Sequence, residues 1–159
     1  MKRKIGFTLV ELLVVISIIG VLIGLALVSF GGVQKQSRDT QRKSDLNQYR
    51  NAMENYGVAH DGLYISRGQW QNLDGTNVCE NVGEGGPLYP VYISECLVDP
   101  QNVAPYKYKY ISDGVGSGKA DAKNYLMYAD LEIGGCWVVC SDGRSFEQAD
   151  TPTDGSPCF

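Results

Sequence analysis

The sequence lacks the residue patterns of most metal, redox and nucleotide sites. It has a single histidine, His60, and none of its five cysteines falls in the C-x-x-C spacing of zinc or redox sites. There is no glycine-rich phosphate loop, and no cysteine or serine motif surrounds His60. These absences predict a chain without catalytic residues and without a cofactor, and therefore not an enzyme.

An excess of positive charge is also missing. The chain has 14 lysines and arginines against 18 aspartates and glutamates, for a net charge of −4, which gives no general case for binding nucleic acid. From Tyr106 to Tyr110 tyrosine alternates with lysine, and a strand would place the rings on one face and the charges on the other. Because a stacking platform needs both on one surface, we expect the tyrosines to pack on a helix and the lysines to face water.

Cysteine is absent from the first 78 residues. The five cysteines that follow are more than an intracellular domain of this size usually carries, and they indicate an oxidising compartment. The length of 159 residues allows one membrane-length segment and one globular unit of ordinary size. The composition therefore fits an anchored, exported domain.

Charge is nearly absent from the first apolar run. A basic tip, Lys2 to Lys4, and then Gly6 precede the run from Phe7 to Phe30, whose one ionisable residue is Glu11. As a helix this run of roughly 24 residues would reach roughly 36 Å, enough to cross a membrane. A carboxylate inside such a segment is costly unless it is paired, so Glu11 is a candidate assembly residue. The alternative is a tolerated polar residue near a helix end.

The position of Gly6 differs from that of the small residues in an ordinary secretory signal, which follow the apolar run. Cleavage after Gly6 would leave the hydrophobic segment on the mature chain and give Phe7 a free α-amino group. That amine, four residues before Glu11, is the cation that the carboxylate lacks. Loss of the leader would also leave 11 basic residues against 18 acidic ones and move the side-chain charge from −4 to −7.

The stretch from Lys4 to Leu13 resembles the class III leader and N-terminal helix of type IV pilins and of the pseudopilins of type II secretion. It combines a short basic leader, Gly6 at the cleavage site, Phe7 after it and Glu11 five positions into the mature chain. The resemblance implies cleavage after Gly6 by a prepilin peptidase, N-methylation of Phe7, and contact between Glu11 and the Phe7 amine of a neighbouring subunit. Unlike many pilins, the chain has no proline in this helix, and glycines supply flexible points instead.

Beyond the apolar run, the sequence predicts that the helix continues to about Val58 and ends at the polar turn His60 to Gly62. Apolar residues with the spacing of an amphipathic face are Leu46, Tyr49, Met53 and Tyr56. The side chains expected to turn away from that face are Asp45, Gln48, Arg50 and Asn51. This half of the helix can support a small sheet.

The same helix carries a basic stripe, which consists of Lys35, Arg38, Arg42, Lys43 and Arg50. A simple count of positive charge would place the stripe in the cytoplasm. The three basic residues of the leader, the cysteines and the resemblance favour export instead. The stripe could meet anionic lipid headgroups, the acidic heads of adjacent subunits, or only water.

From Arg67 to Pro105 the sequence turns to glycine, asparagine, proline and acidic residues, which predicts a long ordered loop. We expect a disulfide between Cys79 and Cys96 to clip this loop. A tail from Arg144 to Phe159 ends the chain. Between the loop and the tail we expect three strands, at Tyr106 to Ser112, Tyr125 to Ile133 and Cys136 to Ser141.

The expected architecture is an α+β fold like that of type IV pilins, with a long N-terminal helix packed on a small antiparallel β-sheet. The first half of the helix is expected to span the membrane, and the second half is amphipathic. Four regions follow: a leader at 1–6, a transmembrane assembly helix at 7–30, an amphipathic helix at 31–58, and a globular head at 59–159.

Two cysteines lie close together near the end of the chain. Cys136 and Cys140 are four residues apart and share a face of their expected strand, so we do not expect them to bond each other. One of them is expected to hold Cys158 and the tail. We favour Cys140, with Cys136 as the alternative, and similar pilins close a C-terminal loop in this way. Five cysteines cannot all pair within one chain, so one is left over.

Calcium is the one metal for which the sequence offers candidate ligands. Asp142, Asp150 and Asp154 lie near glycines, and major pseudopilins bind calcium through a C-terminal loop. EF-hand spacing is absent, however, and acidic turn residues are commoner than calcium ligands, so we assign no metal site.

With the resemblance, the sequence predicts a structural filament subunit, a major type IV pilin that polymerises through its N-terminal helix into a surface pilus. The alternatives are the major pseudopilin of a type II secretion system and a membrane-anchored extracellular binding domain that does not polymerise. Expected partners are identical subunits, prepilin peptidase and methyltransferase, the inner-membrane assembly platform and minor pilins. We expect a single-pass inner-membrane protein with its head outside the cytoplasm, and then a surface filament.

Overall fold

The computed structural model describes residues 6–75, 78–80, 87–156 and 158–159, including their side chains apart from those at 26–29. The chain divides into two compact units, residues 1–37 and residues 38–159. The long helix α1, Leu9–Ala59, contributes to both units. No single described helix is both long and apolar enough to qualify as a membrane span, whereas Leu9–Leu25 and Phe30–Ala59 qualify as a pair by length and composition.

Helix α1 ends at a turn that contains two glycines. The N–H groups of His60 and Gly62 both donate to the carbonyl oxygen of Gly57, at 3.1 and 2.8 Å. Gly62 has a φ of 80°, a left-handed conformation that glycine adopts at little cost. A Cβ at Gly57 would lie 2.9 Å from the Tyr64 ring, so the absent side chain lets that ring pack on the helix end. The helix ends at Ala59, one residue beyond the expected Val58.

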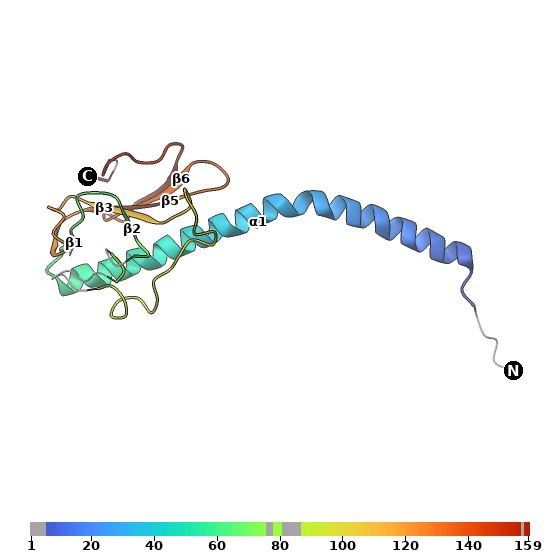
Figure 1. Ribbon diagram of the computed structural model, residues 1–159, viewed down its shortest axis with the longest axis horizontal. Coiled ribbons are helices and arrows are strands. Elements are labelled where there is room, and N and C mark those ends of the chain that lie inside the picture. Colours follow the sequence, from blue (N-terminus) through green and yellow to red (C-terminus); the bar gives the residue numbers. More distant parts are fainter. Residues whose placement is uncertain (1–5, 76–77, 81–86, 157) are drawn as a thin grey trace. The chain divides into compact units, whose positions relative to one another are not determined.

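The head, residues 38–159, contains a five-stranded antiparallel sheet in the order β2-β3-β5-β6-β7. A separate antiparallel pair joins β1, Tyr64–Ile65, to β4, Ala120–Ala122. Figure 1 shows β3, β5 and β6 lying along the second half of α1. The strands of the larger sheet are β2 at Gln71–Asn72, β3 at Lys109–Ser112, β5 at Tyr125–Asp130, β6 at Cys136–Cys140 and β7 at Ser145–Gln148.

The three expected strands are present, but each is shorter than expected. The first begins at Lys109 instead of Tyr106, because the N–H of Lys107 turns back to the carbonyl oxygen of Pro105 at 2.8 Å. The second ends at Asp130 and the third at Cys140, where turns begin. Among the described residues the structure has four further strands that the sequence does not predict, and β7 lies within the expected tail. Three of these four have only two or three residues, too few to show an alternating pattern.

Different parts of the chain bury the two faces of the larger sheet. On one face, Tyr108, Tyr110, Tyr125, Met127 and Val139 pack with the apolar side of α1. The four helix residues expected on that side, from Leu46 to Tyr56, are each fully buried, which confirms the amphipathic pattern. The opposite face holds Ile111, Leu126, Cys136, Val138 and Cys140, and these pack with Trp70, Tyr128, Phe146 and Cys158.

Candidate functional site

A reciprocal cap between Thr8 and Glu11 closes the N-terminus of α1. The backbone N–H and the hydroxyl of Thr8 donate to Oε2 of Glu11 at 2.8 and 2.7 Å, and the N–H of Glu11 donates to the Thr8 hydroxyl oxygen at 3.2 Å. This is a capping box, in which two backbone donors at the helix start are satisfied at once. The spacing Thr8-x-x-Glu11 is the sequence signal of a capping box. The expectation that Glu11 is unpaired does not use this signal.

The described part of the expected cleavage site is accessible. Gly6 is exposed, and a Cβ placed on it would meet no atom within 4 Å. Phe7 is 80% exposed. The basic leader residues Lys2, Arg3 and Lys4 lie outside the described residues.

The apolar residues that follow are uncovered within their own unit. Every large apolar side chain from Phe7 to Leu25 is exposed, from 44% at Val15 to 80% at Phe7 and Leu9. The hydroxyl of Ser17 donates to the carbonyl oxygen of Leu13 at 2.8 Å, so this polar group is satisfied inside the helix. Apolar surface of this extent is unfavourable in water and marks a segment that lipid or other helices cover.

Residues 1–27 match the family described as the prokaryotic N-terminal methylation motif. The chain carries this motif. It is the class III prepilin leader of type IV pilins and pseudopilins, a family of structural subunits rather than enzymes, and it supports an N-terminal helix anchored in a membrane. No curated protein and no solved structure matches the chain. Together with the long helix on antiparallel sheets, the motif establishes the resemblance stated from the sequence.

A buried cluster of charges lies where the helix enters the head. The guanidinium of Arg42, whose side chain is 0% exposed, donates to Asp99 at 2.6 and 3.1 Å, to Asp39 at 2.7 Å and to Glu132 at 3.0 Å. Arg38 adds two hydrogen bonds to Glu132 at 2.5 and 2.6 Å. The ring of Tyr106 lies 4.5 Å from the Arg42 guanidinium carbon. We call Arg38, Asp39, Arg42, Asp99 and Glu132 the ionic cluster.

The ionic cluster sets the charge of its own members. Burial acts to lower the pKa of Arg42, but its hydrogen bonds to Asp99, Asp39 and Glu132 outweigh burial and raise it. The hydrogen bond from Arg38 lowers the pKa of Glu132 to about 2, against the opposing effect of desolvation. Burial also acts to raise the pKa of Asp99, and the Arg42 guanidinium outweighs it, so this pKa falls. All three groups are therefore charged at neutral pH.

Contacts between the helix and the head correct one expectation, for Asp45, and exclude one of the three surroundings left open for the basic stripe. A solvated face is excluded for Arg38, Arg42 and Lys43, because each pairs with a carboxylate of the head. Asp45 does not turn away from the sheet: it is 6% exposed and accepts a hydrogen bond from the Tyr108 hydroxyl at 2.7 Å. The cause is the same in both cases. The sequence alone does not show the distant partner of a polar helix residue, so such a residue is assigned to the solvated face.

The alternating segment from Tyr106 to Tyr110 behaves largely as expected. Tyr108 and Tyr110 are buried against the helix side of the sheet, and the hydroxyl of Tyr110 donates to the carbonyl oxygen of Ile65 at 2.6 Å. The two lysines are half-buried instead of fully in water. They donate to Asn102 and Asn72 at 2.9 and 2.7 Å. Rings and charges therefore do not share an exposed stacking surface in this described segment.

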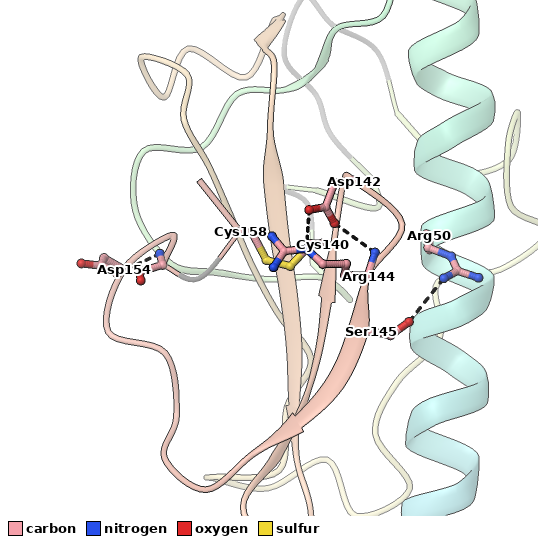
Figure 2. Close-up of a disulfide and its surroundings, with 8 residues drawn as sticks. Arg50, Cys140, Asp142, Arg144, Ser145, Asp154 and Cys158 are labelled. Carbon is pink, nitrogen blue, oxygen red and sulfur yellow. Dashed lines mark hydrogen bonds and ion pairs between the residues drawn. A yellow bond between two sulfur atoms is a disulfide. The ribbon is translucent and has the colours of Figure 1, made fainter.

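Two disulfides tie the head together, and they are the pairs expected from the sequence. Cys79 bonds Cys96, and Cys140 bonds Cys158. Figure 2 shows the second disulfide holding the C-terminal tail to β6. Cys136 stays a buried thiol that donates to the carbonyl oxygen of Asp150 at 3.4 Å. Burial, with a contribution from Asp130, raises the pKa of this thiol to about 11, so it is protonated and unreactive at neutral pH.

Two of the three calcium candidates, Asp142 and Asp154, have separate hydrogen-bond partners. Both carboxylate oxygens of Asp142 accept hydrogen bonds from Arg144, and Asp154 accepts one from the N–H of Ser156 at 2.9 Å. Figure 2 shows Asp154 apart from Asp142, on the other side of the disulfide. Among the described residues, no group of three histidine, cysteine or acidic side chains could hold a metal ion.

Proposed function

We propose that the chain is the subunit of a filament, a major type IV pilin that polymerises through its N-terminal helix into a surface pilus. Prepilin peptidase cleaves after Gly6, and a methyltransferase then modifies the new amine of Phe7. Identical subunits, minor pilins and an inner-membrane assembly platform are the partners. The observation that supports this proposal most strongly is the methylation motif at residues 1–27, together with the exposed apolar side chains of α1 from Leu9 to Leu25.

Glu11 is the residue through which assembly is proposed to act. Within one chain the carboxylate accepts hydrogen bonds only from Thr8 among the described residues, and no basic side chain pairs with it there. A negative charge that moves into a membrane or between apolar helices needs a cation. The Phe7 amine of a neighbouring subunit supplies that cation, so cleavage after Gly6 creates the group that the carboxylate requires. Before assembly, the subunit is a single-pass protein of the inner membrane with its head outside the cytoplasm.

The same motif also occurs in pseudopilins, so the major pseudopilin of a type II secretion system is the second candidate. A membrane-anchored binding domain that never polymerises would need neither Gly6 nor Phe7 nor Glu11 at this spacing. The presence of all three therefore favours a polymerising subunit over a simple anchor.

The test compares Glu11→Ala with Thr8→Ala in strains that make only the variant subunit. Both substitutions break the cap at the start of α1, but only Glu11→Ala removes the charge. We expect Glu11→Ala to insert into the membrane normally and to abolish filaments, while Thr8→Ala keeps most of the filament yield. Normal filaments from Glu11→Ala, or an equal loss in both variants, would contradict the proposed pairing.

A further inference from the structure

Two segments of the head are held to the helix mainly by polar contacts. One is the loop at 97–105, where Val98 and Val103 are 47% and 54% exposed; the other is the turn at 131–135, where Ile133 is 53% exposed. These three side chains contribute little to the core, whereas Leu97 and Leu131, at the starts of the two segments, pack on the core or lie within it. The middle of each segment is held by a carboxylate of the ionic cluster, Asp99 in the loop and Glu132 in the turn, and both bind Arg42.

Each segment is fastened to helix residues of the ionic cluster by several bonds. In the loop, Asp99 binds the Arg42 guanidinium through both oxygens and also accepts the N–H of Gln101 at 2.8 Å. In the turn, Glu132 accepts from Arg38 and Arg42, and the N–H groups of Glu132 and Ile133 donate to Asp39 at 2.9 and 3.0 Å. Asp39 also accepts from Arg42, so one buried guanidinium is shared by helix, loop and turn.

Sharing one guanidinium couples the loop and the turn through Asp99 and Glu132, which lie 33 positions apart in the sequence. The guanidinium is planar and its donors are fixed in direction, so a shift toward one carboxylate weakens its bonds to the others. The cluster holds two positive and three negative side chains, all half-buried or buried. Removing one negative charge would therefore change the balance that holds the remaining pairs in place.

We propose that the ionic cluster is a lock: the loop at 97–105 and the turn at 131–135 open together when it is released, while the sheet stays folded. The sheet has independent support, because β3, β5 and β6 are held by ladder hydrogen bonds and by the fully buried Tyr110, Met127 and Val139. Local opening of this kind is ordinary for segments with few buried apolar contacts. The lock gives the head a way to rearrange Val98, Val103 and Ile133 at its surface, and it does not depend on the proposed function.

Hydrogen exchange of the full chain in detergent tests the lock. Asp99→Asn releases the loop, and Glu132→Gln releases the turn, with only one charge removed in each. We expect either variant to speed amide exchange about ten-fold or more in both segments, because coupling between two sites is reciprocal. Amides of β5 and β6 should exchange as slowly as in the unmodified chain.

Glu147→Gln is the matched control, since Glu147 pairs with Lys43 on the same helix but lies outside the ionic cluster. It should leave both segments unchanged. Three results would overturn the lock: faster exchange confined to the segment that carries the substitution, faster exchange throughout β5 and β6, or no change in either segment.

Discussion

The two parts of helix α1 that lie in different units differ in the burial of their apolar side chains and in the partners of their charged ones. From Phe7 to Leu25 the large apolar side chains are exposed, and the one carboxylate is satisfied three residues away by Thr8. From Arg38 to Tyr56 the apolar side chains are buried, and Arg38, Arg42 and Lys43 pair with carboxylates 57 to 104 positions away in the sequence. The first part is therefore incomplete by itself, whereas the second is complete within one chain.

This difference shows what each part requires from outside. The second part has its partners in the loop, the turn and the sheet of its own head, so it needs no lipid and no second subunit to satisfy its charges. The first part has only its cap, so its stability depends on what covers it. Variants of the head should therefore change folding without changing membrane insertion, and Glu11→Ala at the N-terminus should change filament assembly without changing the folding of the head.

The largest effect on folding is expected from Arg42→Met. The substitution leaves Asp39, Asp99 and Glu132 facing a buried methionine, and breaking a buried ion pair in this way costs about 3–5 kcal/mol. Denaturant unfolding of the full chain in detergent measures the loss. Membrane insertion should be unchanged. A loss below about 1 kcal/mol would mean that the cluster does not hold the head together.

A somewhat smaller effect is expected when the C-terminal disulfide is removed by the double substitution Cys140→Ala and Cys158→Ala. The bond joins residues 18 positions apart, and closing a loop of this size stabilises the folded state by about 3 kcal/mol. Cys136→Ala is the control, because it removes only the buried sulfur and should cost about 1 kcal/mol. Equal losses in the two variants would show that the tail is not held by its disulfide.

Acid should weaken the head through the same cluster. The pKa of Glu132 is about 2 in the folded chain against an ordinary 4.5. A carboxylate with a lowered pKa contributes stability above its unfolded pKa, and that stability is lost as the pH falls from about 4.5 toward about 2. The lowered pKa of Asp99 acts in the same direction, whereas the pKa of Asp45, raised by burial, acts in the opposite one.

Melting temperatures measured across this pH range in the unmodified chain and in Glu132→Gln separate these contributions. The variant should lose less stability on acidification, because it has no carboxylate to protonate at this position. Parallel curves for the two proteins would show that Glu132 is not the group whose charge matters.

The smallest effect is expected from Lys43→Met, the partly exposed counterpart of Arg42→Met. Lys43 pairs with Glu147 at 2.5 Å and lies over the Trp137 ring at 4.9 Å, with side chains 34% and 55% exposed for the pair. Exposed ion pairs contribute at most about 1 kcal/mol. A loss as large as that of Arg42→Met would remove the distinction between buried and exposed members of the basic stripe.

The sequence predicts those features that depend on local periodicity or on a rare residue. Leu46, Tyr49, Met53 and Tyr56 show the helix face, and alternation shows that Tyr108 and Tyr110 are buried on the same side. The loop between Cys79 and Cys96 favours the first disulfide, whereas the sequence leaves Cys158 a choice between Cys140 and Cys136, and the structure has Cys140.

Features that depend on tertiary partners could not be predicted in the same way. Arg42 has the same sequence context as a solvated helix residue, and only the folded chain brings Asp99 and Glu132 to it. The sequence places Asp45 on the polar face for the same reason, because its partner, the Tyr108 hydroxyl, lies 63 positions away. β7 is the edge strand beside β6 in the described sheet, and its four residues carry too short a pattern to separate them from a tail.

The most direct test of the account is the mass of this chain in filaments sheared from the cell surface. The account predicts a chain that begins at an N-methylated Phe7, with both disulfides intact and residues 1–6 removed. A chain that still begins at Met1, or one that is recovered from membranes and never from sheared filaments, would contradict it.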